Sequence, residues 1–124
     1  MGTTDGAPVV LEARPGSEAD RLARQLMARE IDRAYAEGAD PVVLVGMARL
    51  NDAVEVLFVQ LQSPGECGSA GCSTVSFSYK DDRWVRIMDT VGGPVRIANK
   101  SHGMPDLIVQ GGYRLVWDGR KYAG

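Results

Sequence analysis

The stretch "VEVLFVQL" at residues 54–61 is apolar at nearly every position. A short continuous apolar run is typical of a strand that is covered on both faces. We therefore predict that residues 54–61 form the central strand of a sheet. The β-branched run "VVLV" at residues 42–45 predicts a neighbouring strand, and "GMARLNDA" at residues 46–53 is expected to be a connecting loop, in which Asn51 and Asp52 favour a turn.

The next strand pair lies in "TVSFSYKDDRWVRIM" at residues 74–88, where apolar and small polar residues alternate. A two-residue loop at 81–82 would set Phe77 opposite Arg86. A three-residue loop at 81–83 would instead set Phe77 opposite Ile87 and Tyr79 opposite Val85, so that the apolar side chains share a face. We favour the three-residue loop.

The C-terminal third contains several more short strand patterns separated by turn residues. The predicted strands are "PVRIAN" at 94–99, "DLIVQ" at 106–110 and "YRLVW" at 113–117, with Gly111-Gly112 between the last two, and a type I′ turn at Asp118-Gly119 leading into a final strand.

One helix is predicted over residues 17–38. Ser17 is placed to cap the first turn with Asp20 as a capping-box partner, and apolar residues recur at spacings of three and four. Gly38 provides a C-terminal stop, and Pro41 forbids continuation. We predict a flexible lead-in at residues 1–16 and a single α+β domain at 17–124, with one N-terminal amphipathic helix packed on a mainly antiparallel sheet of about six to seven short strands.

The charge and hydropathy pattern restricts the partners. The formal net charge of −2 gives no reason to expect nucleic acid as a partner, and no apolar run approaches the ~20 residues of a membrane span. No signal peptide is recognisable in the chain, whose Met1 start is compatible with a natural beginning or with a replaced leader.

Cys67 and Cys72 flank the small loop "GSAG" at residues 68–71. A zinc site needs four ligands, whereas these cysteines and the single histidine, His102, supply three at most. Thioredoxin-type redox chemistry uses CxxC at the start of a helix, and Cys72 opens a strand instead. The residues favour a disulfide or a pair of inert thiols, with no metal and no cofactor.

The stretch at 50–79 together with "DLIVQGGYRLVWDGRKY" at 106–122 resembles a group of small uncharacterised, mostly secreted or periplasmic proteobacterial proteins. Their pattern runs DLNGDGxxE, CGSGGC, DLxV and YRxDGxxY. The resemblance implies that Cys67 and Cys72 are a disulfide pair and that the location is periplasmic or secreted. Residues 50–55 hold too few carboxylates for the cation loop that the group's first motif suggests, since calcium takes 6 to 8 oxygen ligands.

Other candidate chemistry is sparse. His102 lies close in sequence to Asp106 and Ser101, and a His–Asp pair can perform acid–base catalysis, although an exposed loop histidine is the commoner case. Trp84 lies beside Arg83 and Arg86, which together could form an aromatic-basic patch for a partner.

Two classes of function follow from these observations. The favoured hypothesis is a non-enzymatic envelope or periplasmic interaction module, inhibitor- or immunity-like, that binds a protein or cell-wall component through loops held by the disulfide. The alternative is a small hydrolase-like enzyme that uses His102 and Asp106.

Overall fold

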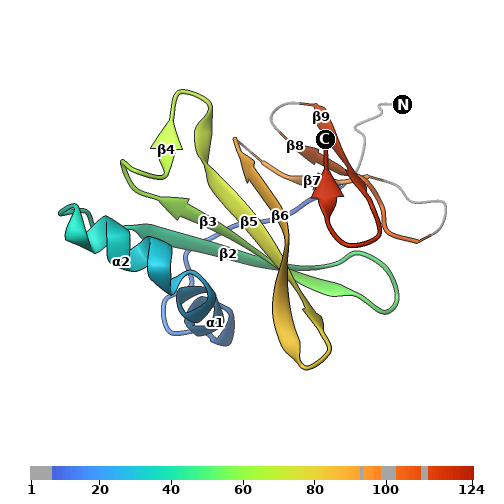
Figure 1. The fold of residues 1–124 in the computed structure, drawn as a ribbon, viewed down its shortest axis with the longest axis horizontal. Coiled ribbons are helices and arrows are strands. Elements are labelled where there is room, and N and C mark those ends of the chain that lie inside the picture. The colour runs from blue at the N-terminus through green and yellow to red at the C-terminus, as the bar shows by residue number, and fades with distance from the viewer. Residues whose placement is uncertain (1–6, 93, 99–102, 110–111) are drawn as a thin grey trace.

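The computed structural model describes residues 7–92, 94–98, 103–109 and 112–124. Over these residues the chain forms two mainly antiparallel sheets and two helices, which confirms the α+β class. Figure 1 shows the helices at one end of the main sheet and the C-terminal sheet toward the other end. The prediction of one helix and one sheet is wrong in number, because the helical segment is broken and the C-terminal strands form a sheet of their own.

The helical segment divides into α1 (Glu18–Leu26) and α2 (Ala28–Ala36). The break lies at Met27, whose φ of −106° and ψ of 21° depart from helical values although its backbone N–H still donates to Ala23. The Met27 side chain is buried. The bend therefore places this side chain in the core while the chain changes direction over the sheet, and nothing in the local sequence, such as proline or glycine, marks it.

Both ends of the helical segment follow the predicted chemistry. The Ser17 hydroxyl oxygen accepts a hydrogen bond from the Asp20 backbone N–H at 3.1 Å, and the Asp20 carboxylate accepts from the Gly16 N–H at 3.1 Å. Gly38 has a φ of +84°, the left-handed conformation that terminates the segment.

The main sheet has the order β2-β3-β5, with β4 and β6 both paired to β5. Its strands are β2 (Val42–Arg49), β3 (Glu55–Gln62), β4 (Cys67–Gly68), β5 (Gly71–Lys80) and β6 (Arg83–Val91). Residues 56–61 of β3 are buried without exception, which confirms the prediction of a central strand covered on both faces. The predicted loop at 46–53 is wrong in its first half, because β2 continues to Arg49 and pairs there with Glu55. The turn at Asn51 and Asp52 is confirmed, since the Asn51 side-chain oxygen accepts a hydrogen bond from the Val54 N–H at 2.9 Å.

Each face of the main sheet has its own core. On one face, α1 and α2 pack through Ala23, Met27 and Ile31 onto side chains of β2, β3 and β5. The opposite face packs against the second sheet, and this core contains Val56, Phe58, Ile87, Met88, Leu107, Val109, Leu115 and Tyr122. We call the first face the helix face.

The β5–β6 hairpin has a two-residue loop, not the predicted three-residue loop. Asp81 and Asp82 have φ values of 53° and 65°, as a type I′ turn requires, and Phe77 lies opposite Arg86. The register shifts between Ser76 and Phe77, so that Ser76 lies opposite Met88. Ile87 is the extra residue, and it lies with Met88 in the core on the face away from the helices. The predicted pairing of Ile87 with Phe77 assumed that both side chains share a face, which the bulge prevents.

The second sheet has the order β1-β7-β8-β9-β10. Its strands are β1 (Ala7–Pro8), β7 (Arg96–Ile97), β8 (Leu107–Val109), β9 (Tyr113–Trp117) and β10 (Tyr122–Ala123). Between β9 and β10, Asp118 has no positive φ whereas Gly119 has a φ of +105°, so the predicted type I′ turn at Asp118-Gly119 is wrong. The Asp118 N–H donates to the Lys121 carbonyl at 2.9 Å, which places the turn one residue later.

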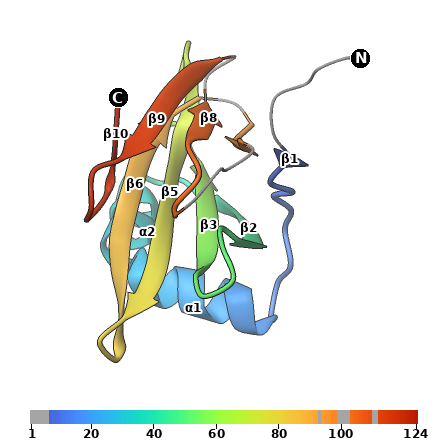
Figure 2. The same cartoon turned by 90° about the vertical axis from the view of Figure 1, so that its right-hand side faces the viewer.

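The N-terminal segment connects the two sheets along one side of the molecule (Figure 2). After β1 pairs with β7, the Val9 N–H donates to the Val95 carbonyl, and Glu12 and Val45 exchange backbone hydrogen bonds of 3.1 and 2.9 Å. Residues 7–12 therefore lie against both sheets. The predicted flexibility of the lead-in stays a prediction.

Candidate functional site

A disulfide joins Cys67 and Cys72, as the sequence resemblance implied. The two cysteines lie directly opposite each other in the β4–β5 ladder, with Cα atoms 3.9 Å apart, and Gly68 lies opposite Gly71. A side chain at Gly71 has no room, because its Cβ would lie 2.7 Å from the Gly92 Cα. The small residues of this loop therefore allow β5 and the end of β6 to approach closely.

Backbone hydrogen bonds also hold the disulfide loop. The Cys67 N–H donates to the Ser63 carbonyl at 2.9 Å, and the Ser73 N–H donates to the Glu66 carbonyl at 2.8 Å. The half-buried disulfide thus closes a hairpin that is already hydrogen-bonded at its base. This arrangement indicates a structural role for the disulfide, which holds β4 against β5.

The proposed catalytic residues are only partly described by the structure. His102 and Ser101 lie outside the described residues. The Asp106 carboxylate accepts from the Arg114 guanidinium at 2.9 Å, and both side chains are partly exposed. Asp106 is therefore engaged in an ion pair, and its role in acid–base catalysis with His102 stays a prediction.

Asp106 also lies near a buried tyrosine. The Tyr122 hydroxyl donates to the Pro105 carbonyl at 2.7 Å. Burial, with a smaller contribution from the Asp106 charge, raises the pKa of Tyr122 well above its ordinary value. Tyr122 is consequently a neutral hydrogen-bond donor that fixes the segment before β8, and this arrangement supports the second sheet.

The three residues of the predicted aromatic-basic patch are not equivalent. Trp84 pairs with Tyr79 and packs at the margin of the helix-face core, whereas the next residue outward, Arg83, pairs with Lys80 and faces the other side of the hairpin. Arg86 shares the helix face with Trp84, but it forms ion pairs with Glu30 at 3.1 Å and Asp89 at 3.5 Å. Trp84 and Arg83 therefore lie on opposite faces of the hairpin, and Arg86 lies on the face of Trp84 but is engaged in ion pairs. The predicted binding role of the patch stays a prediction.

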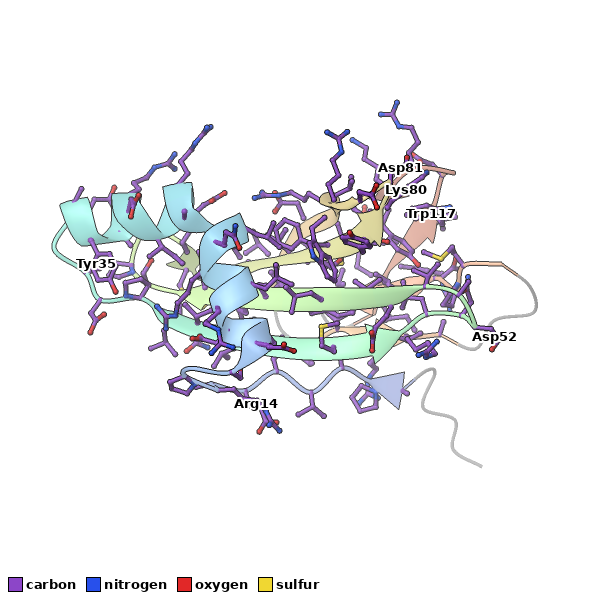
Figure 3. The ribbon with its side chains drawn as sticks, turned by 90° about the horizontal axis from the view of Figure 1, so that it is seen from below. Arg14, Tyr35, Asp52, Lys80, Asp81 and Trp117 are labelled. Atoms are coloured by element: carbon purple, nitrogen blue, oxygen red, sulfur yellow. A yellow bond between two sulfur atoms is a disulfide. The ribbon has the colours of Figure 1, made fainter. Side chains whose placement is uncertain are left out.

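The helix face is only partly covered by the helices. In Figure 3 the helices lie over one half of the sheet, toward Tyr35, and the β2–β3 turn marked by Asp52 lies at the other end. Met47 has 43 % of its surface exposed and Tyr79 has 56 %. The Tyr79 and Trp84 rings meet edge to face, with centroids 5.3 Å apart. Apolar and aromatic side chains therefore remain accessible beside α1.

An open groove of about 900 Å³ runs along this margin of α1. Its floor comes from β2, one wall comes from α1, and the other walls come from the N-terminal segment and from Trp84. We call it the α1 groove, and its principal lining residues are Val10, Glu18, Leu22, Met47 and Trp84. The volume falls in the range of ligand-binding clefts.

The α1 groove is lined by charges of both signs, and its arginines form bonds within the chain. Arg14, which projects from the N-terminal segment in Figure 3, pairs with Glu12 at 2.7 Å. The Arg21 guanidinium donates to the Gly16 carbonyl. These hydrogen bonds hold the arginines in place but leave their positive charge, so the two arginines and two glutamates of the groove lining balance.

The groove does not contain the signature of a metal centre. Over the residues that the structure describes, no three histidine, cysteine, aspartate or glutamate side chains come together as metal ligands. In the same part of the chain, neither helix has the length and apolar character needed to cross a membrane.

Comparison with known proteins adds no assignment, since no family model, curated protein or solved structure matches this chain. The resemblance to the secreted proteobacterial group stays a prediction.

Sequence reasoning identified Trp84 but missed the rest of the α1 groove. Met47 fell in a stretch predicted as a loop, and Val10 fell in the predicted lead-in. The period-two spacing of Val43, Val45 and Met47 was the available signal, because it extends the strand through Gly46. No sequence signal shows where the helices stop covering the sheet.

Proposed function

We propose that the protein is a non-enzymatic interaction module that holds a segment of another protein in the α1 groove. The observation that carries the proposal is the apolar surface of an open groove between β2 and α1, in which Val10 is 67 % and Met47 is 43 % exposed while Trp84 is partly buried. Covering such half-exposed side chains would stabilise a complex by roughly 1 kcal/mol each. A strand and helix framework also keeps the ordering cost of binding low.

The disulfide supports a periplasmic or secreted location for this module. A disulfide persists in oxidising compartments and is rare in the reducing cytosol. Cys67 and Cys72 hold the end of the sheet opposite the β5–β6 turn, so they would stiffen the sheet that forms the groove without taking part in contacts.

A peptide-display selection tests this function. The intact oxidised protein is used to select peptides from a random library, and the selected peptides are measured against wild type, Met47→Arg and Trp84→Ala. We expect both variants to weaken binding at least ten-fold, because each changes an anchor of the groove. Val116→Arg is the matched control, since Val116 is 51 % exposed on β9 and does not line the groove.

Two outcomes would contradict the proposed binding site. If the selected peptides bind Met47→Arg and wild type equally well, or if Val116→Arg is as damaging as Met47→Arg, the α1 groove is not the binding site. Circular dichroism of each variant confirms that it is folded.

A further inference from the structure

A second, smaller pocket lies between α2 and the turn that connects β3 with β4, and it shares no lining residue with the α1 groove. Its volume is about 140 Å³. This is enough for a group of a few non-hydrogen atoms, since a water molecule takes about 30 Å³ in the liquid. We call it the α2 pocket, and the polar and turn residues that line it are Glu30, Arg33, Glu37, Ser63, Gly65 and Glu66.

Ser63 contributes a buried hydroxyl that has no partner. Its side chain continues the alternation of Leu57, Val59 and Leu61, which pack beneath the helices, so Ser63 faces α2. Ser63 is 8 % exposed, and its hydroxyl oxygen has no hydrogen bond within the described part of the chain. A buried polar group costs free energy unless it is hydrogen-bonded, and native structures contain few such groups. The free hydroxyl therefore indicates a polar occupant of the α2 pocket.

Gly65 lets the carboxylate of Glu37 approach this turn. A Cβ at Gly65 would lie 2.9 Å from Glu37 Oε1, closer than real Cβ atoms approach a neighbour. The missing side chain at position 65 thus provides the space that the carboxylate occupies. Among the described residues, neither Glu37 nor Glu66 forms a side-chain hydrogen bond or an ion pair. Two carboxylates are therefore available as acceptors in the same pocket as Ser63.

The α2 pocket carries a net negative charge. Three glutamates and one arginine line it, and Glu30 is neutralised by its ion pair with Arg86 at 3.1 Å. When Arg33 is counted in full against a second glutamate, one carboxylate still remains uncompensated. The C-terminal end of α2 adds partial negative charge, because the helix carbonyl groups point towards that end. A cation is therefore the favoured occupant.

The acceptors fit an ammonium group better than a metal ion. Within the described residues, no three acidic, histidine or cysteine side chains come together as metal ligands. A primary ammonium group carries three N–H donors, and charge-assisted hydrogen bonds are stronger than neutral ones. We propose that the α2 pocket binds a primary ammonium group, which donates to the Ser63 hydroxyl and to the carboxylates of Glu37 and Glu66. The group belongs to a free amine or to a lysine side chain of another protein.

A ligand titration followed by NMR of the intact oxidised protein tests the site. The probes are n-butylammonium as a free amine, the peptide acetyl-Gly-Lys-Gly-amide as a lysine side chain, and tetramethylammonium, which has the same charge but no N–H donor. The amide signals of Gly65 and Glu66 report binding at constant ionic strength. We expect n-butylammonium to bind with a Kd of about 10 mM and tetramethylammonium to bind about ten-fold more weakly. Binding of both amines would include lysine side chains as ligands, and binding of n-butylammonium alone would restrict the site to free amines.

Two variants examine the acceptors. Ser63→Ala should weaken n-butylammonium binding about five-fold, because it removes one acceptor. It should be at least as stable as wild type in chemical denaturation, since the hydroxyl has no partner in the free protein. Gly65→Ala should also weaken binding, because the new Cβ displaces the Glu37 carboxylate. Ser76→Ala is the matched control, since it removes another buried hydroxyl without a partner, which lies opposite Met88 and outside the pocket.

Three results would overturn the inference. If tetramethylammonium binds as tightly as n-butylammonium, the pocket attracts charge without using N–H donors. If Ser63→Ala and Ser76→Ala bind n-butylammonium alike, the Ser63 hydroxyl is not an acceptor. If the Gly65 and Glu66 signals do not move at about 100 mM n-butylammonium, the pocket holds water only. The α1 groove takes no part in these measurements, so failure of this inference is distinguishable from failure of the proposed function.

Discussion

Arg86 lies directly opposite Phe77 across β5 and β6, with its guanidinium carbon 5.4 Å from the centre of the Phe77 ring. The same guanidinium reaches Glu30 of α2 at 3.1 Å. One side chain thus contacts the sheet beneath it and the helix above it. This position depends on the bulge at Ile87, which turns Arg86 and Asp89 to the helix face together.

Replacing Arg86 with alanine should lower the free energy of unfolding by about 1 to 2 kcal/mol, because a cation–π contact and two partly exposed ion pairs are lost together. Chemical denaturation measures the change. Arg83→Ala is the control, because Arg83 is exposed at the hairpin, and it should change stability by less than about 0.5 kcal/mol. Equal effects of the two variants would show that Arg86 does not hold α2 against the main sheet.

The Asp81-Asp82 turn offers a second prediction. Both residues have positive φ, which costs L-residues free energy, and Asn-Gly is the preferred pair for this turn. Asp81→Asn/Asp82→Gly should therefore raise the free energy of unfolding by about 1 kcal/mol, as measured by chemical denaturation. Asp82→Val should lower it, since a β-branched residue tolerates the left-handed conformation poorly. Stabilisation by Asp82→Val would contradict the two-residue turn.

These elements show which parts of the fold were predictable. The strand at 55–62 was predictable because burial on both faces leaves an uninterrupted apolar run, and the ends of the helical segment were predictable because capping is local chemistry. The bulge at Ile87 was not, since it depends on a core supplied by strands that come later in the chain. The break at Met27 likewise depends on the sheet beneath it. The α1 groove was therefore not predictable either, because its extent is set by where the bent helices cover the sheet.

The disulfide should contribute about 2 kcal/mol to stability, because it closes a short loop and constrains the unfolded chain only modestly. Cys67→Ser/Cys72→Ser should lose this amount in denaturant titrations, and added reductant should destabilise the wild type but not the variant. Alkylation of native protein under denaturing conditions, followed by mass spectrometry, provides the independent check. Two free thiols in that experiment would contradict the pairing.

The Asp118 carboxyl should titrate below its ordinary pKa of 3.8. Hydrogen bonds from the backbone N–H groups of Lys121 and Arg120 stabilise the carboxylate and lower this pKa. Because the folded pKa is lowered, the stabilisation is present above the unfolded pKa and is lost as the pH falls through the folded value. An NMR titration of the side-chain carboxyl carbon measures the pKa directly, and a value at or above 3.8 would contradict the turn geometry.

Gly46 should be intolerant of any side chain, because a Cβ at this position would lie 2.2 Å from the Val10 carbonyl oxygen. Gly46→Ala must therefore displace the N-terminal segment from β2, and we expect a loss of about 1 to 3 kcal/mol, the usual range for overpacking. Hydrogen exchange should then accelerate at the Val45 N–H, which donates to Glu12. Gly68→Ala is the matched control, since no atom lies within 4 Å of a Cβ there. Since Val10 and Glu12 line the α1 groove, Gly46→Ala should also weaken peptide binding, whereas Gly68→Ala should not. Unchanged exchange at Val45 in a folded Gly46→Ala protein would show that the N-terminal segment does not form this wall.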